Sequence, residues 1–136
     1  MREANERLQF SYELHEYKAF SDRRVLDIDC GNGNVLSRYA KEGAHILGVD
    51  LTRTGIELCW RRFALSQLSG NFTVGSVEDL PYPDNMFDVV CSMSVLHHTP
   101  NTQKAVDEVF HVLDRAGGSS SSVITGTQPS FGRIFF

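Results

Sequence analysis

A glycine-rich turn and a solitary aspartate each follow a short apolar run. The first run, residues 25–29, leads into Cys-Gly-Asn-Gly at 30–33, and the second, residues 44–49, ends at Asp50. Glycines let a backbone approach a ligand closely, and free amide groups at the start of a helix favour an anionic group. A carboxylate at Asp50 can accept hydrogen bonds from both hydroxyls of a ribose. Together, the turn and the acid predict a nucleoside site.

Both signals also have a structural interpretation, because tight turns use glycine without any ligand and a lone acid often caps a helix. Their positions, each directly after a strand, favour the nucleoside. A nicotinamide dinucleotide is disfavoured, since its fingerprint needs glycine where the chain has Asp29 and Asn34. The sequence also lacks a GxxxxGK[ST] phosphate loop. The predicted ligand is therefore a nucleoside without a diphosphate.

Strand-like and helix-like segments alternate along the chain in a way that can position this site. Strand-like runs lie at 25–29, 44–49, 72–74 and 87–93, and helical periodicity lies at about 34–40, 54–68 and 100–113. This order indicates right-handed βαβ crossovers. We therefore predict an α/β fold with a Rossmann-like, doubly wound, mostly parallel sheet, whose ligand lies beyond the carboxyl ends of the strands.

The two ends of the chain are expected to be less regular than the core. Residues 5–20 have amphipathic spacing, so 1–23 are interpreted as an N-terminal helical cap on a core at 24–118. Four serines at 119–122 stand where a fifth strand should begin. We interpret 119–136 as an irregular end of a single domain.

Composition narrows the possible partners. The chain has 136 residues, a formal net charge of −4 and no cluster of Lys and Arg beyond pairs, which disfavours nucleic acid. Its three cysteines are far apart and form no CxxC, which favours free thiols in a reducing compartment over disulfides or zinc. No apolar run reaches membrane length. We expect a cytoplasmic protein without a metal or membrane partner.

Six segments resemble the successive signatures of class I S-adenosylmethionine-dependent methyltransferases, in that family's order and spacing. They lie at 25–33, 48–52, 79–84, 87–90, 95–100 and 112–118. The resemblance implies S-adenosylmethionine as the cofactor and methyl transfer as the activity. The acidic charge favours a small-molecule acceptor over a nucleic acid.

The resemblance also implies which residues bind the cofactor. Asp27 would open the cofactor loop, and the backbone at 30–33 would face the methionine part of the cofactor. Asp50 would face the ribose and Leu51 the adenine, while residues 94–97 would line the route to the acceptor. The implied set is Asp27, Asp29, Cys30, Gly31, Asn32, Gly33, Asp50, Leu51, Ser76, Val77, Ser92 and Met93. His97 is the candidate base for an acceptor that carries a proton, and a structural role for His97 and His98 is the alternative.

Three departures from the family pattern support a second hypothesis. Asp29 stands where the family usually has glycine, and Ser76 where it commonly has an acid. The chain also ends before the family's last helix and antiparallel hairpin, which predicts an unfinished sheet edge and a homodimer that covers it. The alternative function is a catalytically weak or inactive methyltransferase-like fold that binds the cofactor poorly or serves in assembly.

Overall fold

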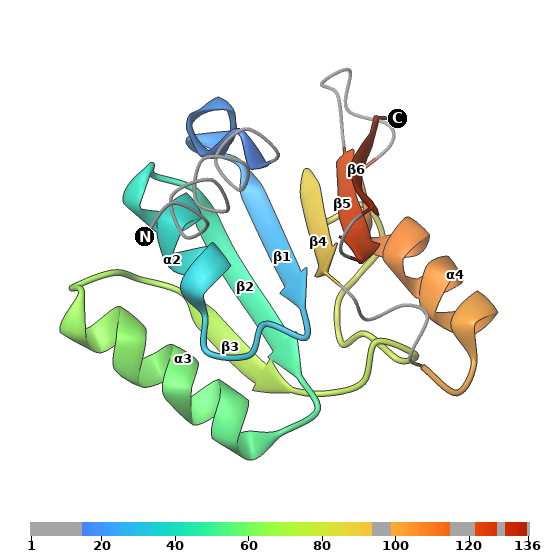
Figure 1. The fold of residues 1–136 in the computed structure, drawn as a ribbon, viewed down its shortest axis with the longest axis horizontal. Helices are drawn as coiled ribbons and strands as arrows, with labels where there is room; N and C mark the ends of the chain where they lie inside the picture. Colours follow the sequence, from blue (N-terminus) through green and yellow to red (C-terminus); the bar gives the residue numbers. More distant parts are fainter. Residues whose placement is uncertain (1–14, 94–98, 115–121, 128–129, 136) are drawn as a thin grey trace.

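The computed structural model describes residues 15–93, 99–114, 122–127 and 130–135. They form a six-stranded sheet in the order β3-β2-β1-β4-β5-β6, in which β6 alone is antiparallel to its neighbour (Figure 1). The strands are β1 (Arg24–Ile28), β2 (His45–Asp50), β3 (Asn71–Val74), β4 (Val89–Met93), β5 (Ser122–Thr127) and β6 (Ser130–Phe135). The predicted Rossmann-like α/β fold is confirmed.

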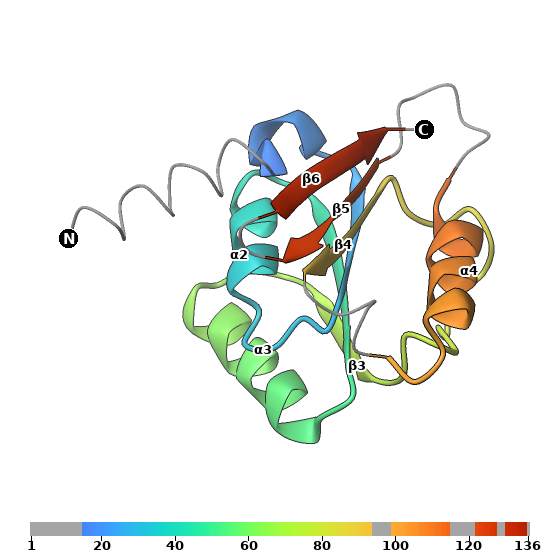
Figure 2. The ribbon, with the colours of Figure 1, turned by 45° about the vertical axis from the view of Figure 1, so that its right-hand side comes forward.

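Helices cover both faces of the sheet, as Figures 1 and 2 show. The described helical elements are the 3-10 helix η1 (Tyr17–Phe20), α2 (Asn34–Lys41), α3 (Arg53–Leu65) and α4 (Thr102–Val112). One apolar cluster joins η1, α2 and α3 to the sheet, and a second joins α4 to the opposite face. This arrangement is the doubly wound architecture that the alternating segments predict.

The central strands are apolar on both faces because each face meets a helix layer. In β1, Val25 belongs to the first cluster and Leu26 to the second, and neither side chain is exposed to solvent. In β5, Ile124 belongs to the first cluster and Val123 to the second. Burial on two faces therefore accounts for the continuous apolar runs.

The strand order reverses between β1 and β4, which places a crevice at the carboxyl ends of these strands. β1 pairs in parallel register with β2, so that Ile28 lies opposite Val49. The loop that follows β1 therefore meets the end of β2. This register positions the candidate site.

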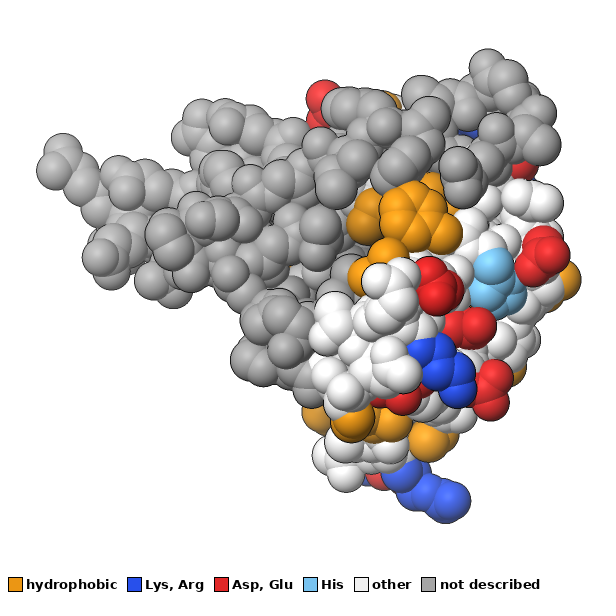
Figure 3. Space-filling model, turned by 90° about the vertical axis from the view of Figure 1, so that its right-hand side faces the viewer, with side chains coloured by type: hydrophobic (Ala, Val, Ile, Leu, Met, Phe, Trp, Pro, Cys, Tyr) orange, Lys and Arg blue, Asp and Glu red, His pale blue; other side chains and the backbone are white. Residues whose placement is uncertain are grey.

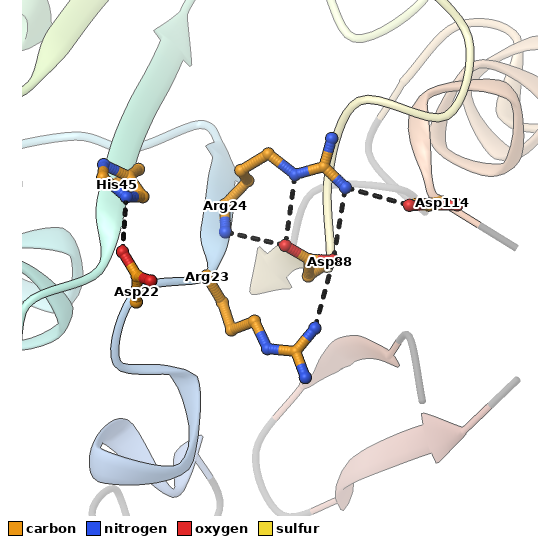
Figure 4. Close-up of polar contacts among 6 residues, drawn as sticks. All are labelled: Asp22, Arg23, Arg24, His45, Asp88 and Asp114. Atoms are coloured by element: carbon orange, nitrogen blue, oxygen red, sulfur yellow. Dashed lines mark hydrogen bonds and ion pairs between the residues drawn. The ribbon is translucent and has the colours of Figure 1, made fainter. Parts of the chain in front are cut away.

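An ion-pair network joins the amino ends of the strands, away from that crevice (Figure 4). Asp88, just before β4, accepts hydrogen bonds from the backbone N (2.8 Å) and the Nε (3.2 Å) of Arg24. Nη2 of Arg24 also donates to Asp114 at 2.9 Å. Although burial acts in the opposite direction, the bonds from Arg24 lower the pKa of Asp88. The network ties β1, β4 and the segment after α4 together.

The end of the chain is more regular than the sequence predicts. Residues 122–127 and 130–135 form β5 and β6, which pair from Ser122 opposite Phe135 to Thr127 opposite Ser130. Val123 and Ile124 suffice for a fifth strand because both are buried, one on each face of the sheet. The irregular end that we predicted at 119–136 is therefore wrong for these two segments. The edge of β5, which we expected to be unfinished, is paired with β6 within the chain.

The described helix boundaries differ from three further expectations. Glu16 has a left-handed backbone (φ 46°) and separates residue 15 from η1, so a single helix does not continue to Phe20. α4 begins at Thr102 instead of near 100, and Asn101 caps it, with its side chain accepting from the backbone N of Lys104 at 3.0 Å. α3 ends at Leu65 instead of near 68. Among the residues described, no helix has both the length and the apolarity to cross a membrane.

Candidate functional site

The loop after β1 is held against the end of β2 by backbone hydrogen bonds. The carbonyl of Val49 accepts from the backbone N of Asp29 (2.8 Å) and of Cys30 (3.1 Å). Gly31 and Gly33 have positive φ angles of 53° and 73°, a region that favours glycine. Gly33 is the residue before α2, so the chain turns from strand to helix within five residues. The sequence folds this way because the two glycines allow the turn.

Asp50 is oriented from two directions. Its Oδ2 accepts from the backbone N of Gly31 at 3.0 Å, and its Oδ1 accepts from the backbone N and Oγ1 of Thr52 at 2.8 and 2.7 Å. Thr52 in turn caps α3 by accepting from the backbone N of Gly55 at 3.1 Å. Burial raises the pKa of Asp50, but these hydrogen bonds outweigh it and lower the pKa overall. Asp50 is therefore a fixed carboxylate at the end of β2.

Asp29 lies beside Asp50 and interacts with it. Partial burial, a hydrogen bond with Asp50 and the charge of Asp50 together raise the pKa of Asp29. Asp29 also has a left-handed backbone with φ 64°, the region that glycine adopts most readily. A carboxylate has about four lone-pair positions. The backbone N atoms of Gly31 and Thr52 and Oγ1 of Thr52 fill three of these positions on Asp50, and a protonated Asp29 would fill the fourth.

A hollow of about 220 Å³ opens beside this pair of acids. It is lined by Asp29, residues 49–51, residues 75–78 and residues 99–100, which come from the ends of β1, β2 and β3 and from the segment before α4. Leu51 is 72% exposed at its edge, so its apolar surface is available to a flat ring. The hollow therefore combines an apolar wall with a fixed carboxylate.

The two loop glycines face different surroundings. A Cβ built at Gly31 would meet no atom within 4 Å, whereas one built at Gly33 would lie 3.1 Å from Sγ of Cys59. The loop is thus packed against α3 at Gly33 and open at Gly31. The free space over Gly31, next to Asp50, fits a ligand that touches the backbone there.

The structure brings some of the residues implied by the resemblance to the hollow and places others elsewhere. Those that line it are Asp29, Asp50, Leu51, Ser76 and Val77. Gly31 joins them through its bond to Asp50. Cys30 is buried beneath the loop, and Asn32 is exposed, with its carbonyl accepting from Nε of Arg62 at 2.8 Å.

The remaining implied residues lie inside the sheet or outside the described part. Asp27 is buried within β1, and burial, with the charges of Asp29, Cys59 and Asp50, raises its pKa well above the ordinary value. Ser92 is fully buried in β4, and its hydroxyl has no hydrogen-bond partner among the residues described. Met93 packs against the first apolar cluster. His97 lies outside the described residues.

Glu78 is a lining residue that sequence reasoning missed. It lies two residues after Ser76, whose Oγ accepts from the backbone N of Glu78 at 3.1 Å. Oε1 of Glu78 accepts from the backbone N of Asn101 at 2.8 Å and so joins the loop after β3 to the start of α4. An acid therefore lines the hollow two positions after Ser76. The sequence signal for it is an acid anywhere in the loop after β3, not only at position 76.

The strand order, the glycine turn and the fixed acid define a Rossmann-like domain with a hollow at the carboxyl ends of its strands. The chain belongs to the methyltransferase domain family, since the model of that family, described as "Methyltransferase domain", matches residues 26–119. The family predicted from the six sequence segments is therefore confirmed.

Relatives and a solved structure agree with this assignment. The chain is 40% identical over 100 residues to a phthiotriol/phenolphthiotriol dimycocerosates methyltransferase of Mycobacterium ulcerans, covering 72% of this chain and 36% of the relative. It is 36% identical over 124 residues to a fatty-acid O-methyltransferase of Mycolicibacterium smegmatis, covering 87% and 44%. The YcgJ protein of Bacillus subtilis has a similar fold, with a TM-score of 0.74 and 27% identity over 86% of this chain and 50% of that one. The chain thus spans less than half the length of these curated relatives.

Proposed function

We propose that this chain is the cofactor-binding part of an S-adenosylmethionine-dependent methyltransferase that acts on a small molecule. The observation that carries the proposal is the hollow beside Gly31 and Asp50, where an open backbone position adjoins a fixed carboxylate. Family membership supports the same activity.

Different residues at the hollow would contact different parts of the cofactor. Asp50 would accept hydrogen bonds from the ribose hydroxyls, and Leu51 would pack on the adenine ring. The backbone at Gly31 would face the methionine part, because nothing within 4 Å of its Cβ position blocks that approach. When bound, S-adenosylmethionine supplies a methyl group activated by a positively charged sulfur. The chain contributes chiefly by holding the reacting groups in line.

The acceptor that we propose is a small molecule with an oxygen nucleophile, as the name of the fatty-acid O-methyltransferase relative suggests. The charge of the chain supports a small acceptor over nucleic acid, since the net charge is −4. Figure 3 shows acidic side chains spread over the face around α4, without a basic patch on the described part of that face. His97 as the base for such an acceptor stays a prediction.

The second candidate is a fold of this family that binds the cofactor weakly or only assembles. Its support is the contact between Asp29 and Asp50, which uses an acceptor position that a ribose hydroxyl would need. The fold alone does not decide between the two candidates, because one fold can carry many functions or none.

The expected cytoplasmic location and the expected homodimer also stay predictions. The described cysteines are free and buried, which is typical of a reducing compartment such as the cytoplasm. A homodimer that covers a sheet edge would form through β6 or β3, the outer strands of the described sheet, because β5 is paired on both sides. Size-exclusion chromatography with light scattering tests this, and a monomer at micromolar concentration counts against the dimer.

Thermal unfolding with and without S-adenosylhomocysteine separates the two candidate functions. A ligand at 100 times its dissociation constant stabilises the folded state by about 2.7 kcal/mol. The active candidate therefore predicts a rise in melting temperature of several degrees, and adenosine diphosphate-ribose, which carries a diphosphate, serves as the control. No rise at millimolar ligand would favour the second candidate.

A further inference from the structure

Two of the three cysteines lie against each other beneath the candidate cofactor loop. Sγ of Cys30, in the loop after β1, lies 3.6 Å from Sγ of Cys59 in α3, although the two residues are 29 positions apart in the chain. Both are buried, with exposed fractions of 6% and 0%. The third, Cys91, lies in β4, where its thiol contacts the hydroxyl of Tyr39 at 3.9 Å. The first two cysteines therefore form a pair, and Cys91 stands apart from it.

Close packing directs the two thiols toward each other. A Cβ built at Gly48 of β2 would lie 2.9 Å from Sγ of Cys30, so this sulfur rests directly on the strand. On the other side, Sγ of Cys59 donates to the carbonyl of Gly31 at 3.2 Å, and a Cβ built at Gly33 would lie 3.1 Å from it. The sulfur of Cys59 thus supports the loop that carries the amide bonded to Asp50.

We propose that Cys30 and Cys59 form a reversible disulfide when the protein meets a peroxide, and that this bond weakens cofactor binding. The effect on the cofactor rests on the proposed function, whereas the disulfide itself does not.

The reaction balances with hydrogen peroxide as the oxidant. The hydrogen bond with Cys30 lowers the pKa of Cys59, and the same contact raises the pKa of Cys30, so Cys59 supplies the attacking thiolate. Its sulfur bonds to one peroxide oxygen, the O–O bond breaks, and the departing hydroxide takes up the proton that Cys59 released, forming water. The sulfur of Cys30 then attacks the sulfenic sulfur, the S–O bond breaks, and the hydroxyl leaves with the proton of Cys30 as a second water. Two thiols lose two electrons, and one peroxide gains them.

Bond formation must move the loop. A disulfide has an S–S length of about 2.05 Å, so the sulfurs have to approach each other by roughly 1.5 Å. Cys30 begins the turn 30–33, and Cys59 would leave the carbonyl of Gly31. The amide of Gly31 is the one that orients Asp50. Because a hydrogen bond to a charged group is a strong one, we expect cofactor affinity to fall about tenfold when this contact is lost.

Peptide mapping tests the disulfide directly. The reduced protein is treated with hydrogen peroxide, its remaining thiols are blocked with N-ethylmaleimide, and the non-reduced digest is analysed by mass spectrometry. The proposal predicts a cross-linked pair of peptides that contain Cys30 and Cys59, absent after dithiothreitol. It predicts the same pair in Cys91→Ser and none in Cys59→Ser, with Cys59→Ala as a second variant should serine perturb folding. A digest of the wild type without this cross-link overturns the proposal.

Calorimetric titration with S-adenosylhomocysteine tests the consequence. We expect about tenfold weaker binding by the oxidised wild type, recovery on reduction, and no effect of peroxide on Cys59→Ser. Equal affinities of the cross-linked and reduced forms would overturn the link to the cofactor. Failure of the reduced protein to bind at all would count against the proposed function, while the peptide map would still decide whether the disulfide forms.

Discussion

Asp29 and Asp50 lie next to each other at the edge of the hollow, although both side chains are carboxyl groups. Burial and Asp50 raise the pKa of Asp29, whereas hydrogen bonds outweigh burial and lower the pKa of Asp50, so Asp29 takes up a proton before Asp50 does. A ribose that binds Asp50 must displace Asp29. The relation of these two acids therefore governs how well the site can work.

Replacement of Asp29 tests this competition. At a pH at which Asp29 is protonated, Asp29→Gly frees an acceptor position on Asp50. We expect cofactor binding to tighten there by about tenfold, the equivalent of one hydrogen bond to a charged group. Asp29→Asn is the matched variant, since an amide keeps donating to Asp50, and it should bind weakly. Titration calorimetry with S-adenosylhomocysteine measures the affinity of all three proteins. Equal affinities would show that Asp29 does not compete with the ribose for Asp50.

The same contact predicts a pH dependence of binding. Protonated Asp29 donates to Asp50, and ionised Asp29 does not, so affinity of the wild type should rise as pH increases through the raised pKa of Asp29, above about 4. Asp29→Gly should lose this rise and bind tightly throughout, and Asp29→Asn should lose it and bind weakly. A wild-type affinity that does not rise as pH increases from about 4 contradicts the prediction.

The two glycines of the loop should respond differently to alanine. Gly31→Ala places a methyl group in open space at φ 53°, so it should cost only about 1 kcal/mol of stability while obstructing the ligand. Gly33→Ala meets Sγ of Cys59 at 3.1 Å in addition, and we expect a loss of about 2 kcal/mol. Urea unfolding and calorimetry separate the effects. The account fails if Gly31→Ala binds the cofactor as the wild type does.

Asp50→Asn should reduce cofactor affinity by tenfold or more, since it removes the charge that accepts the ribose hydroxyls. The amide also brings an NH₂ group toward donors that the carboxylate accepts from, Gly31 and Thr52. Asp107→Asn, on the exposed side of α4, is the control and should leave affinity unchanged. Similar affinities of the Asp50 and Asp107 variants would exclude Asp50 as the ribose ligand.

The stability of the folded state should depend on pH in opposite directions at two buried acids, Asp88 and Asp27. Arg24 lowers the pKa of Asp88, so the stability that Asp88 contributes is present above about pH 4 and is lost as pH falls through its lowered pKa. Asp88→Asn should therefore cost about 1–2 kcal/mol at pH 7 and much less in acid.

Burial raises the pKa of Asp27, so the folded state loses stability as pH rises from about 4 through that raised pKa. Asp27→Asn should accordingly stabilise the protein at pH 7 but not at pH 3, and urea titrations across pH would reveal the opposite signs.

The order of the elements and the positions of the turn and of Asp50 were readable from local sequence. Apolar runs, helical periodicity and the glycines at 31 and 33 are properties of neighbouring residues, and the structure has them where they were expected. The strand after the serine run was missed because only Val123 and Ile124 are strongly apolar, and their burial depends on helices on two faces. Local sequence therefore predicts a central strand poorly when few of its residues are apolar.

Contacts between distant segments were decided by the fold alone. Neither the meeting of Asp29 with Asp50 nor that of Cys30 with Cys59 follows from spacing, because each depends on the register of β1 with β2 and on how α3 packs beneath the loop. Glu78 reaches the hollow for the same reason, through the loop after β3. Chain order thus predicts which residues follow the strands, while the direction of each side chain depends on packing across the sheet.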